Sequence, residues 1–179
     1  MSARTRSTAI SAFCFILTAL TVNCGKQESA TAPPAEASAA AGPWQQSMPA
    51  EFAGLTVKDG GACYLDVVNG ADAANPPRIR PNSMIALAGW AVADPKAGRS
   101  GGGVGIQLNS STPFFIVADR YNRPGLGTAL KSSSALDGGG IKLDPTQLNL
   151  PAGDYRVIFL IQSDRELLRC DTGRSLRVN

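Results

Sequence analysis

The stretch SMIALAGWAVAD, residues 83–94, decides the fold that we expect for this chain. Its apolar residues are interrupted only by Gly89, and Trp90 is one of two tryptophans in the sequence. A short apolar run bounded by turn residues is typical of a buried strand. We therefore predict that this run is the central strand of a β-sandwich and serves as scaffold without carrying chemistry.

The spacing of the large apolar residues in this run is compatible with two arrangements of the strand. In a regular strand Ile85 and Leu87 share one face, whereas Trp90 and Val92 share the opposite face. A β-bulge at Gly89 would bring all four side chains to one buried side, and we favour this arrangement. The alternative is a strand buried on both faces, with the second face covered by a loop or by the segment that precedes the domain.

Composition and turn spacing favour an all-β domain. The chain has 19 glycines, 12 prolines, 44% apolar residues and only 17% charged residues, and no long amphipathic helix that could cover a parallel sheet. We predict an antiparallel β-sandwich of about eight strands. The expected strands are residues 53–57, 62–69, 83–94, 104–109, 114–118, 141–143 (an edge strand), 156–162, 166–171 and 176–178.

Three connections have signals of their own. Residues 70–81 contain three prolines and cannot form a central strand. Residues 128–134 are expected to form a short helical turn or an irregular crossover. Gly153 precedes Tyr155 at the start of a strand, a pattern similar to the tyrosine corner of Greek-key sandwiches, in which the phenol bonds back to upstream backbone.

The N-terminus has the three parts of an export signal. Arg4 and Arg6 precede an apolar core at residues 9–20, which is too short to span a bilayer, and a short polar approach leads to Cys24. This leader resembles a bacterial lipoprotein signal, which implies that Cys24 is acylated and becomes the new N-terminus. The alternative is an ordinary signal peptide cut near Ala30.

The expected domain organisation follows from this leader. Residues 1–23 are the signal peptide, residues 24–47 are the lipidated cysteine and a disordered tether rich in Ala, Ser and Pro, and residues 48–179 are the β-sandwich. The lipoprotein resemblance, with Gly25 after the cysteine, implies sorting to the bacterial outer membrane. A periplasmic or secreted protein is the alternative.

The four cysteines have different expected fates. Cys14 leaves with the leader and Cys24 would carry lipid, which leaves Cys63 and Cys170 in the folded region. Two remaining cysteines in an exported protein most often form a disulfide, and we predict this bridge. A thiol nucleophile or a metal site is disfavoured because the chain has no histidine to act as base or ligand.

Three segments of the chain have a recognisable pattern: Gly89-Trp90-Ala91-Val92-x-Asp94, Arg120-x-x-Arg123-Pro124 and Leu150-Pro-x-Gly-x-Tyr155. Together they resemble bacterial immunoglobulin-like modules of cell-surface and envelope proteins. The resemblance covers residues 65–178. It implies an immunoglobulin-like sandwich with a non-catalytic accessory role, and it supplies no ligand.

The absence of histidine also limits catalysis. Ser-His-Asp and Cys-His chemistry are excluded, and we predict no enzyme activity, no metal and no cofactor. A carboxylate-dependent hydrolase is a weaker alternative, because pairing among 14 acidic residues is invisible in the sequence. Calcium binding by the loops at residues 72–75 and 137–140 is another weak alternative. The glycines at 101–105 precede a strand and are expected to form a flexible turn and not a phosphate loop.

The best candidate surface for recognition is a cluster of charged and aromatic residues after the strand at 114–118. Such a mixture is enriched at binding hot spots. The cluster consists of Asp119, Arg120, Tyr121, Asn122 and Arg123. The alternative is that Arg120 pairs internally with Asp119 or another acid and that Arg123 packs on Tyr121, so that both hold the crossover in place.

The expected partners are the membrane, through the lipid anchor, and an envelope protein or glycan. Of 17 Lys and Arg residues, Arg4 and Arg6 lie in the leader, which leaves 15 against 14 Asp and Glu. This near balance argues against nucleic acid as a partner. A carbohydrate-binding module acting on envelope glycans is the main alternative to a protein-binding or assembly module.

Overall fold

The structure, a computed structural model, describes residues 43–179. The predicted signal peptide, Cys24 and most of the predicted tether lie outside the described residues. Among the described residues, no helix is long and apolar enough to cross a membrane.

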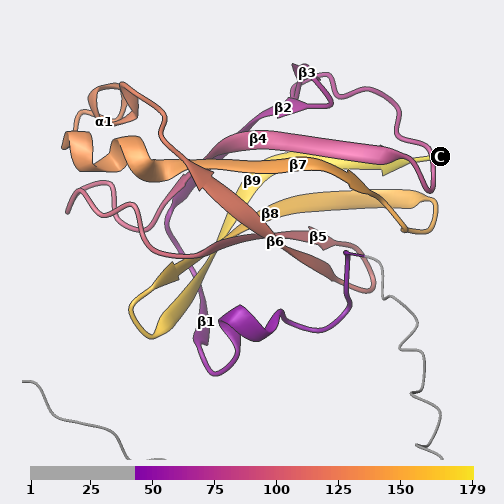
Figure 1. The fold of residues 1–179 in the computed structure, drawn as a ribbon, viewed down its shortest axis with the longest axis horizontal. Coiled ribbons are helices and arrows are strands. Elements are labelled where there is room, and N and C mark those ends of the chain that lie inside the picture. The colour runs from indigo at the N-terminus through magenta and orange to yellow at the C-terminus, as the bar shows by residue number, and fades with distance from the viewer. Residues whose placement is uncertain (1–42) are drawn as a thin grey trace, which may run out of the picture. The chain divides into compact units, whose positions relative to one another are not determined.

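Strands make up most of the described part of the chain, with a few helical turns between them (Figure 1). In chain order the elements are η1 (Ala50–Phe52), β1 (Thr56–Asp59), β2 (Ala62–Val68), β3 (Ala71–Asp72), β4 (Met84–Val92), β5 (Val104–Asn109), β6 (Phe114–Tyr121), α1 (Leu126–Ala129), η2 (Ser134–Gly139), β7 (Gly140–Gln147), β8 (Gly153–Ser163) and β9 (Glu166–Val178).

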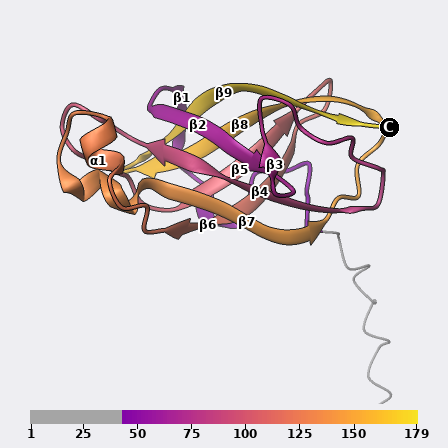
Figure 2. The ribbon, with the colours of Figure 1, turned by 90° about the horizontal axis from the view of Figure 1, so that it is seen from above.

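The strands form one continuous sheet in the order β1-β9-β8-β5-β6-β7-β4-β2-β3. Strand β6 belongs to both halves of this sheet, because its first part pairs with β5 and its last three residues pair with β7. The sheet folds on itself at β6, so β8 and β9 lie on one side and β7 and β4 on the other (Figure 2). The all-β sandwich is confirmed, with nine strands in the described residues and one parallel pair, β1 with β9.

The core lies between the two halves, and β4 contributes every second residue to it. Ile85, Leu87, Gly89 and Ala91 are buried in regular alternation. Trp90 is half-buried on the other face, so the predicted bulge at Gly89 is wrong. The alternative, a strand covered on both faces, describes β4.

The bulge lies instead in β2, opposite Gly89. Leu65 pairs with Gly89 and Val67 pairs with Ala88, so Asp66 is an extra residue in β2. A Cβ on Gly89 would lie 2.3 Å from the carbonyl oxygen of Tyr64 and 3.0 Å from the Phe159 ring of the facing half. Glycine is required there because the neighbouring strand β2 and the Phe159 ring of the facing half both come close to its Cα.

The crossover between β6 and β7 covers the outer face of β4. Leu126 of α1 and Leu136 of η2 pack with Val92 into a small apolar cluster, and Trp90 packs against this cluster. The predicted helical turn at 128–134 is therefore present, although it begins two residues earlier, at Leu126.

Strand β7 is not the edge strand that the sequence predicts. It lies between β4 and β6 and pairs with both. The strand tolerates Pro145 because the pairing with β4 is irregular there: Leu143 and Thr146 have partners in β4, and Asp144 and Pro145 between them do not. On the other side, β6 pairs only with residues 140–142 of β7.

Two links, one between distant residues and one local, are both predicted by the sequence. A disulfide joins Cys63 of β2 to Cys170 of β9, with 6.1 Å between the Cα atoms. It connects the two halves on the side away from β6, where β2 and β9 do not pair with each other and an isolated β-bridge joins Ile79 to Val178. The hydroxyl of Tyr155 donates a 2.8 Å hydrogen bond to the carbonyl oxygen of Pro151.

Candidate functional site

The predicted recognition cluster lies at the end of β6 and in the loop that follows. Along β6 the side chains of Ile116, Ala118 and Arg120 share the inner face, because successive residues of a strand alternate. Arg120 is therefore the last inward residue of the strand. It lies at the open end of the core, below the loop that connects β4 to β5.

Arg120 uses its guanidinium inside the domain. Its Nε donates to the carbonyl oxygen of Gly102 at 2.9 Å, Nη1 to that of Ala91 at 2.8 Å, and Nη2 to that of Ser100 at 2.8 Å. Burial lowers the pKa of Arg120 to about 10, which keeps the side chain charged at neutral pH. The alternative prediction, that Arg120 bonds within the domain, is therefore correct, although the acceptors are backbone carbonyl oxygens and not an acidic side chain.

Arg123 is also bound within the domain. It forms an ion pair with Asp66, the extra residue of the β2 bulge, and its backbone N–H donates to the carbonyl oxygen of Asp137 at 2.6 Å. The hydrogen bond with Asp66 raises the pKa of Arg123. These contacts fix the start of the crossover on the edge of β2.

The remaining members of the cluster differ in exposure. The Tyr121 ring lies against Gly140, where a Cβ would be 2.7 Å from its Cε1 atom, and Tyr121 is half-buried. Asp119 and Asn122 are exposed. Contact with a partner stays a prediction for this cluster, and its two exposed side chains are the ones free to make that contact.

The two loops considered for calcium use their carboxylates locally. Oδ1 of Asp72 accepts a 2.7 Å hydrogen bond from the backbone of Ala74, and Oδ1 of Asp137 accepts a 2.8 Å bond from that of Gly127. Within residues 43–179, no group of three or more His, Cys, Asp or Glu residues is placed to hold a metal ion.

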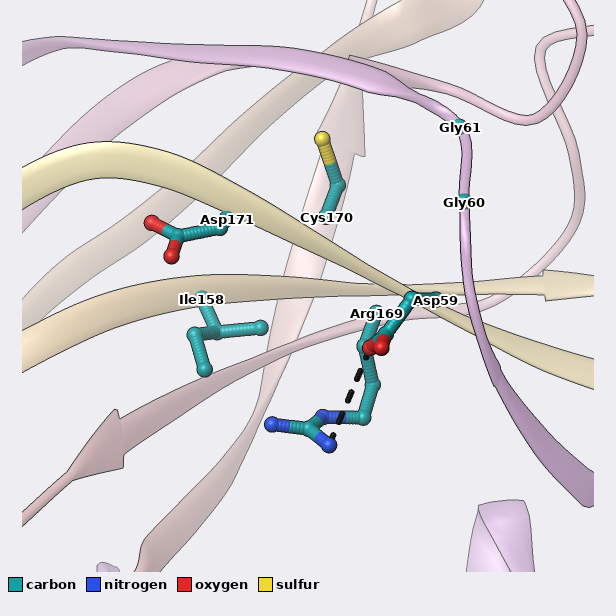
Figure 3. Close-up of a pocket in the computed structure, with 7 residues that line it drawn as sticks. All are labelled: Asp59, Gly60, Gly61, Ile158, Arg169, Cys170 and Asp171. Carbon is teal, nitrogen blue, oxygen red and sulfur yellow. Dashed lines mark ion pairs between the residues drawn. The ribbon is translucent and has the colours of Figure 1, made fainter.

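A pocket that the sequence does not predict lies where β1 leaves the edge of β9 (Figure 3). Its volume is about 470 Å³. The lining residues come from β1 and the turn after it, from β8 and from β9: Asp59, Gly60, Gly61, Ile158, Arg169, Cys170 and Asp171.

Arg169 is the unusual group in this pocket. Its Nε is buried and has no hydrogen-bond partner within the described residues. Its Nη1 lies 3.8 Å from Oδ1 of Asp59, which is an ion pair longer than a hydrogen bond. Asp59 is itself 88% exposed at its side chain. Arg169 thus carries donors that the chain does not fully satisfy.

The other charged group of the pocket is satisfied. Asp171 accepts hydrogen bonds from Nε of Arg156 at 2.9 and 2.7 Å and from the backbone of Gly173 at 2.9 Å. Cys170 lies between Arg169 and Asp171 on β9, and its sulfur turns to the opposite side of the strand in Figure 3. The pocket therefore holds the guanidinium of Arg169 beside the largely exposed carboxylate of Asp59, its ion-pair partner.

Because successive residues of a strand point to opposite faces, the sequence could have predicted that Arg169 and Asp171 share one face of β9 and that Cys170 lies on the other. Their pocket was missed because its second wall is β1, which pairs with β9 across more than 100 residues of sequence. Nothing local in the sequence indicates that pairing.

Comparison of the chain with models of known families, with curated proteins and with solved structures finds no match.

Proposed function

We propose that this protein is a lipoprotein of the bacterial cell envelope, and that its β-sandwich is a non-catalytic binding or assembly module. The observation that carries the proposal is the disulfide between Cys63 and Cys170. Disulfides persist in oxidising compartments such as the periplasm, and are rare in the cytosol. Together with the lipoprotein-like leader, the bridge supports export and anchoring through Cys24.

Fractionation of cells tests the anchor. The intact protein should sediment with membranes and incorporate labelled fatty acid, whereas the Cys24→Ala variant should lose the label and become soluble. Cys14→Ala is the matched control, because Cys14 lies inside the apolar part of the leader. Label and membrane attachment that persist in Cys24→Ala would overturn the lipid anchor.

Thiol labelling tests the compartment separately. In protein taken from cells under denaturing conditions, Cys63 and Cys170 should resist alkylation until a reductant is added. If both cysteines are alkylated without reductant, the proposal of an oxidising compartment is wrong.

Site-specific crosslinking tests the binding role. A photoreactive residue at Asn122, an exposed member of the cluster of residues 119–123, should capture an envelope component in living cells. The same residue at Ser111, exposed in the turn between β5 and β6, is the control. Equal products from both positions would show that residues 119–123 are not the contact surface.

A carbohydrate-binding module is the second candidate, and the pocket beside Arg169 favours it. The pocket has a volume of about 470 Å³ and is lined in part by the charged side chains of Asp59, Arg169 and Asp171, which can form hydrogen bonds with the hydroxyl groups of a sugar. A glycan array that includes peptidoglycan fragments tests this candidate, and the absence of binding to any saccharide would remove it.

A further inference from the structure

We propose that Asn69 is a site of spontaneous deamidation and that the fold controls the reaction. The side-chain amide is protected while Asn69 is bonded to β4, and it is lost when this edge of the sheet opens. The reaction needs only water, and its products are aspartate and isoaspartate at this position. The inference goes beyond the proposed binding role and does not depend on it.

The first support is the turn that contains Asn69. Asn69 and Gly70 form the whole connection between β2 and β3, because Val68 pairs with Ala71. Their φ angles are 49° and 80°, the left-handed values of a type I′ hairpin turn, which favours Asn-Gly. Both residues are exposed, and a Cβ on Gly70 would find no heavy atom within 4 Å. The backbone nitrogen of Gly70 is therefore open to react.

The chemistry begins at this nitrogen. It attacks Cγ of Asn69 and loses its proton, the bond between Cγ and Nδ2 breaks, and ammonia leaves with that proton. Water then opens the resulting cyclic imide at either of its carbonyls, which gives aspartate or isoaspartate. Glycine after asparagine permits the attack most readily, because no Cβ lies beside the attacking nitrogen.

The second support is the way the folded chain holds the amide. Oδ1 of Asn69 accepts a 2.7 Å hydrogen bond from the backbone of Ala86, and Nδ2 donates a 3.4 Å bond to the carbonyl oxygen of Met84. The side chain thus bonds to the edge of β4 just beyond Val68, the last residue of β2 that pairs with it. Rotation of the amide toward Gly70 breaks both bonds, so opening of this edge limits the reaction.

The products cannot restore these contacts. An aspartate at position 69 has no donor for the carbonyl oxygen of Met84 and places a negative charge beside it. Isoaspartate adds a methylene group to the backbone of a turn that has only two residues. Each opening event that ends in deamidation therefore leaves a permanent change that weakens the contact between this turn and β4.

Peptide mapping by mass spectrometry measures the rate. The full chain, purified in detergent and incubated in mildly alkaline buffer, should deamidate at Asn69 at least about tenfold more slowly than in concentrated urea. The free peptide of residues 67–71 is the matched control. It should react in both buffers at the rate of the urea-unfolded chain, which separates the effect of folding from that of urea.

Variants test the consequence for stability. Asn69→Asp reproduces the aspartate product and should lower the melting temperature at neutral pH by about 3 °C. Asn122→Asp adds the same charge at another exposed position and should change it little. A melting temperature for Asn69→Asp equal to that of Asn122→Asp would overturn the claim that the product weakens the edge.

Two outcomes of the rate measurement would overturn the proposal itself: deamidation of Asn69 as fast in the folded chain as in urea, or no deamidation in urea. Neither outcome bears on the membrane fractionation of Cys24→Ala, so this inference and the proposed lipoprotein function fail independently.

Discussion

Nη1 of Arg120 donates a 2.8 Å hydrogen bond to the carbonyl oxygen of Ala91, which joins β6 to β4 although β7 lies between them in the sheet. The same guanidinium holds two carbonyls of the loop between β4 and β5. One cation thus fixes the end of the core where both halves of the sandwich and this loop meet.

Substitution of Arg120 should therefore unfold the domain more readily. Arg120→Ala removes three charge-assisted hydrogen bonds, among them the one to the carbonyl oxygen of the buried Ala91, so we expect a loss of about 3 kcal/mol in the free energy of unfolding. Arg120→Lys keeps the charge but cannot reach three acceptors, and should lose about 2 kcal/mol. Urea denaturation followed by circular dichroism measures both.

Asn122→Ala is the control for this series, because its side chain is exposed and should change the free energy of unfolding by less than about 0.5 kcal/mol. A change equally small in Arg120→Ala would contradict the structural role of Arg120.

The disulfide should stabilise the domain mainly by restricting the unfolded chain. Its cysteines are 107 residues apart, and for a loop of about 100 residues the chain-entropy model gives about 4.7 kcal/mol as an upper figure. The double variant Cys63→Ala, Cys170→Ala should therefore lose about 3–5 kcal/mol in urea denaturation.

Reductant supplies the control for this measurement. Dithiothreitol should lower the midpoint of unfolding of the parent protein toward that of the double variant, and it should leave the variant unchanged. A parent protein that responds no more than the variant would show that the bridge contributes little.

The sequence predicted features that depend on neighbours along the chain. The strand at residues 104–109, the turn that leads to Tyr155 and the pairing of the two cysteines left in the domain each need only a few residues or a count. Arg120 could have been placed as well, because extending the alternation of Ile116 and Ala118 by one step puts it on the inner face.

Features that depend on distant partners could not be predicted. The bulge lies in β2 and not at Gly89. Gly89 is instead the position where Tyr64 of β2 and Phe159 of β8 come too close for any side chain, which the sequence does not indicate. The pocket beside Arg169 needs the parallel pairing of β1 with β9. Both arise only when segments far apart in the sequence come together.

Gly89 offers a test of that close approach. In Gly89→Ala the new methyl group would lie 2.3 Å from the carbonyl oxygen of Tyr64, so β2 or β4 must move. We expect a loss of about 3 kcal/mol in the free energy of unfolding, at the upper end for overpacked cores. Thermal and urea denaturation measure it.

Gly138→Ala is the matched control, since the nearest atom to its Cβ would be Oγ of Ser100 at 4.0 Å. This variant should unfold within about 1 kcal/mol of the parent protein. If Gly89→Ala is as stable as Gly138→Ala, Tyr64 and the Phe159 ring do not lie as close to Gly89 as the structure places them.

The ion pair of Asp154 with Arg177 predicts how stability depends on pH. Nε of Arg177 donates to Oδ1 of Asp154 at 2.7 Å and Nη2 donates to Oδ2 at 3.1 Å, and this hydrogen bonding lowers the pKa of Asp154 in the folded chain. Because the unfolded chain then binds the proton more readily, the contribution is present above the ordinary pKa of 3.8. It is lost as the pH falls through the lower folded value.

Asp154→Asn should therefore lower the melting temperature at neutral pH, and the difference from the parent protein should vanish below the folded pKa of Asp154. Both side chains are more than half exposed, so the difference should also shrink in high salt. Glu51→Gln, in an exposed position, controls for the loss of a negative charge. A melting difference for Asp154→Asn that persists unchanged into strong acid would show that it arises from packing and not from the ionised pair.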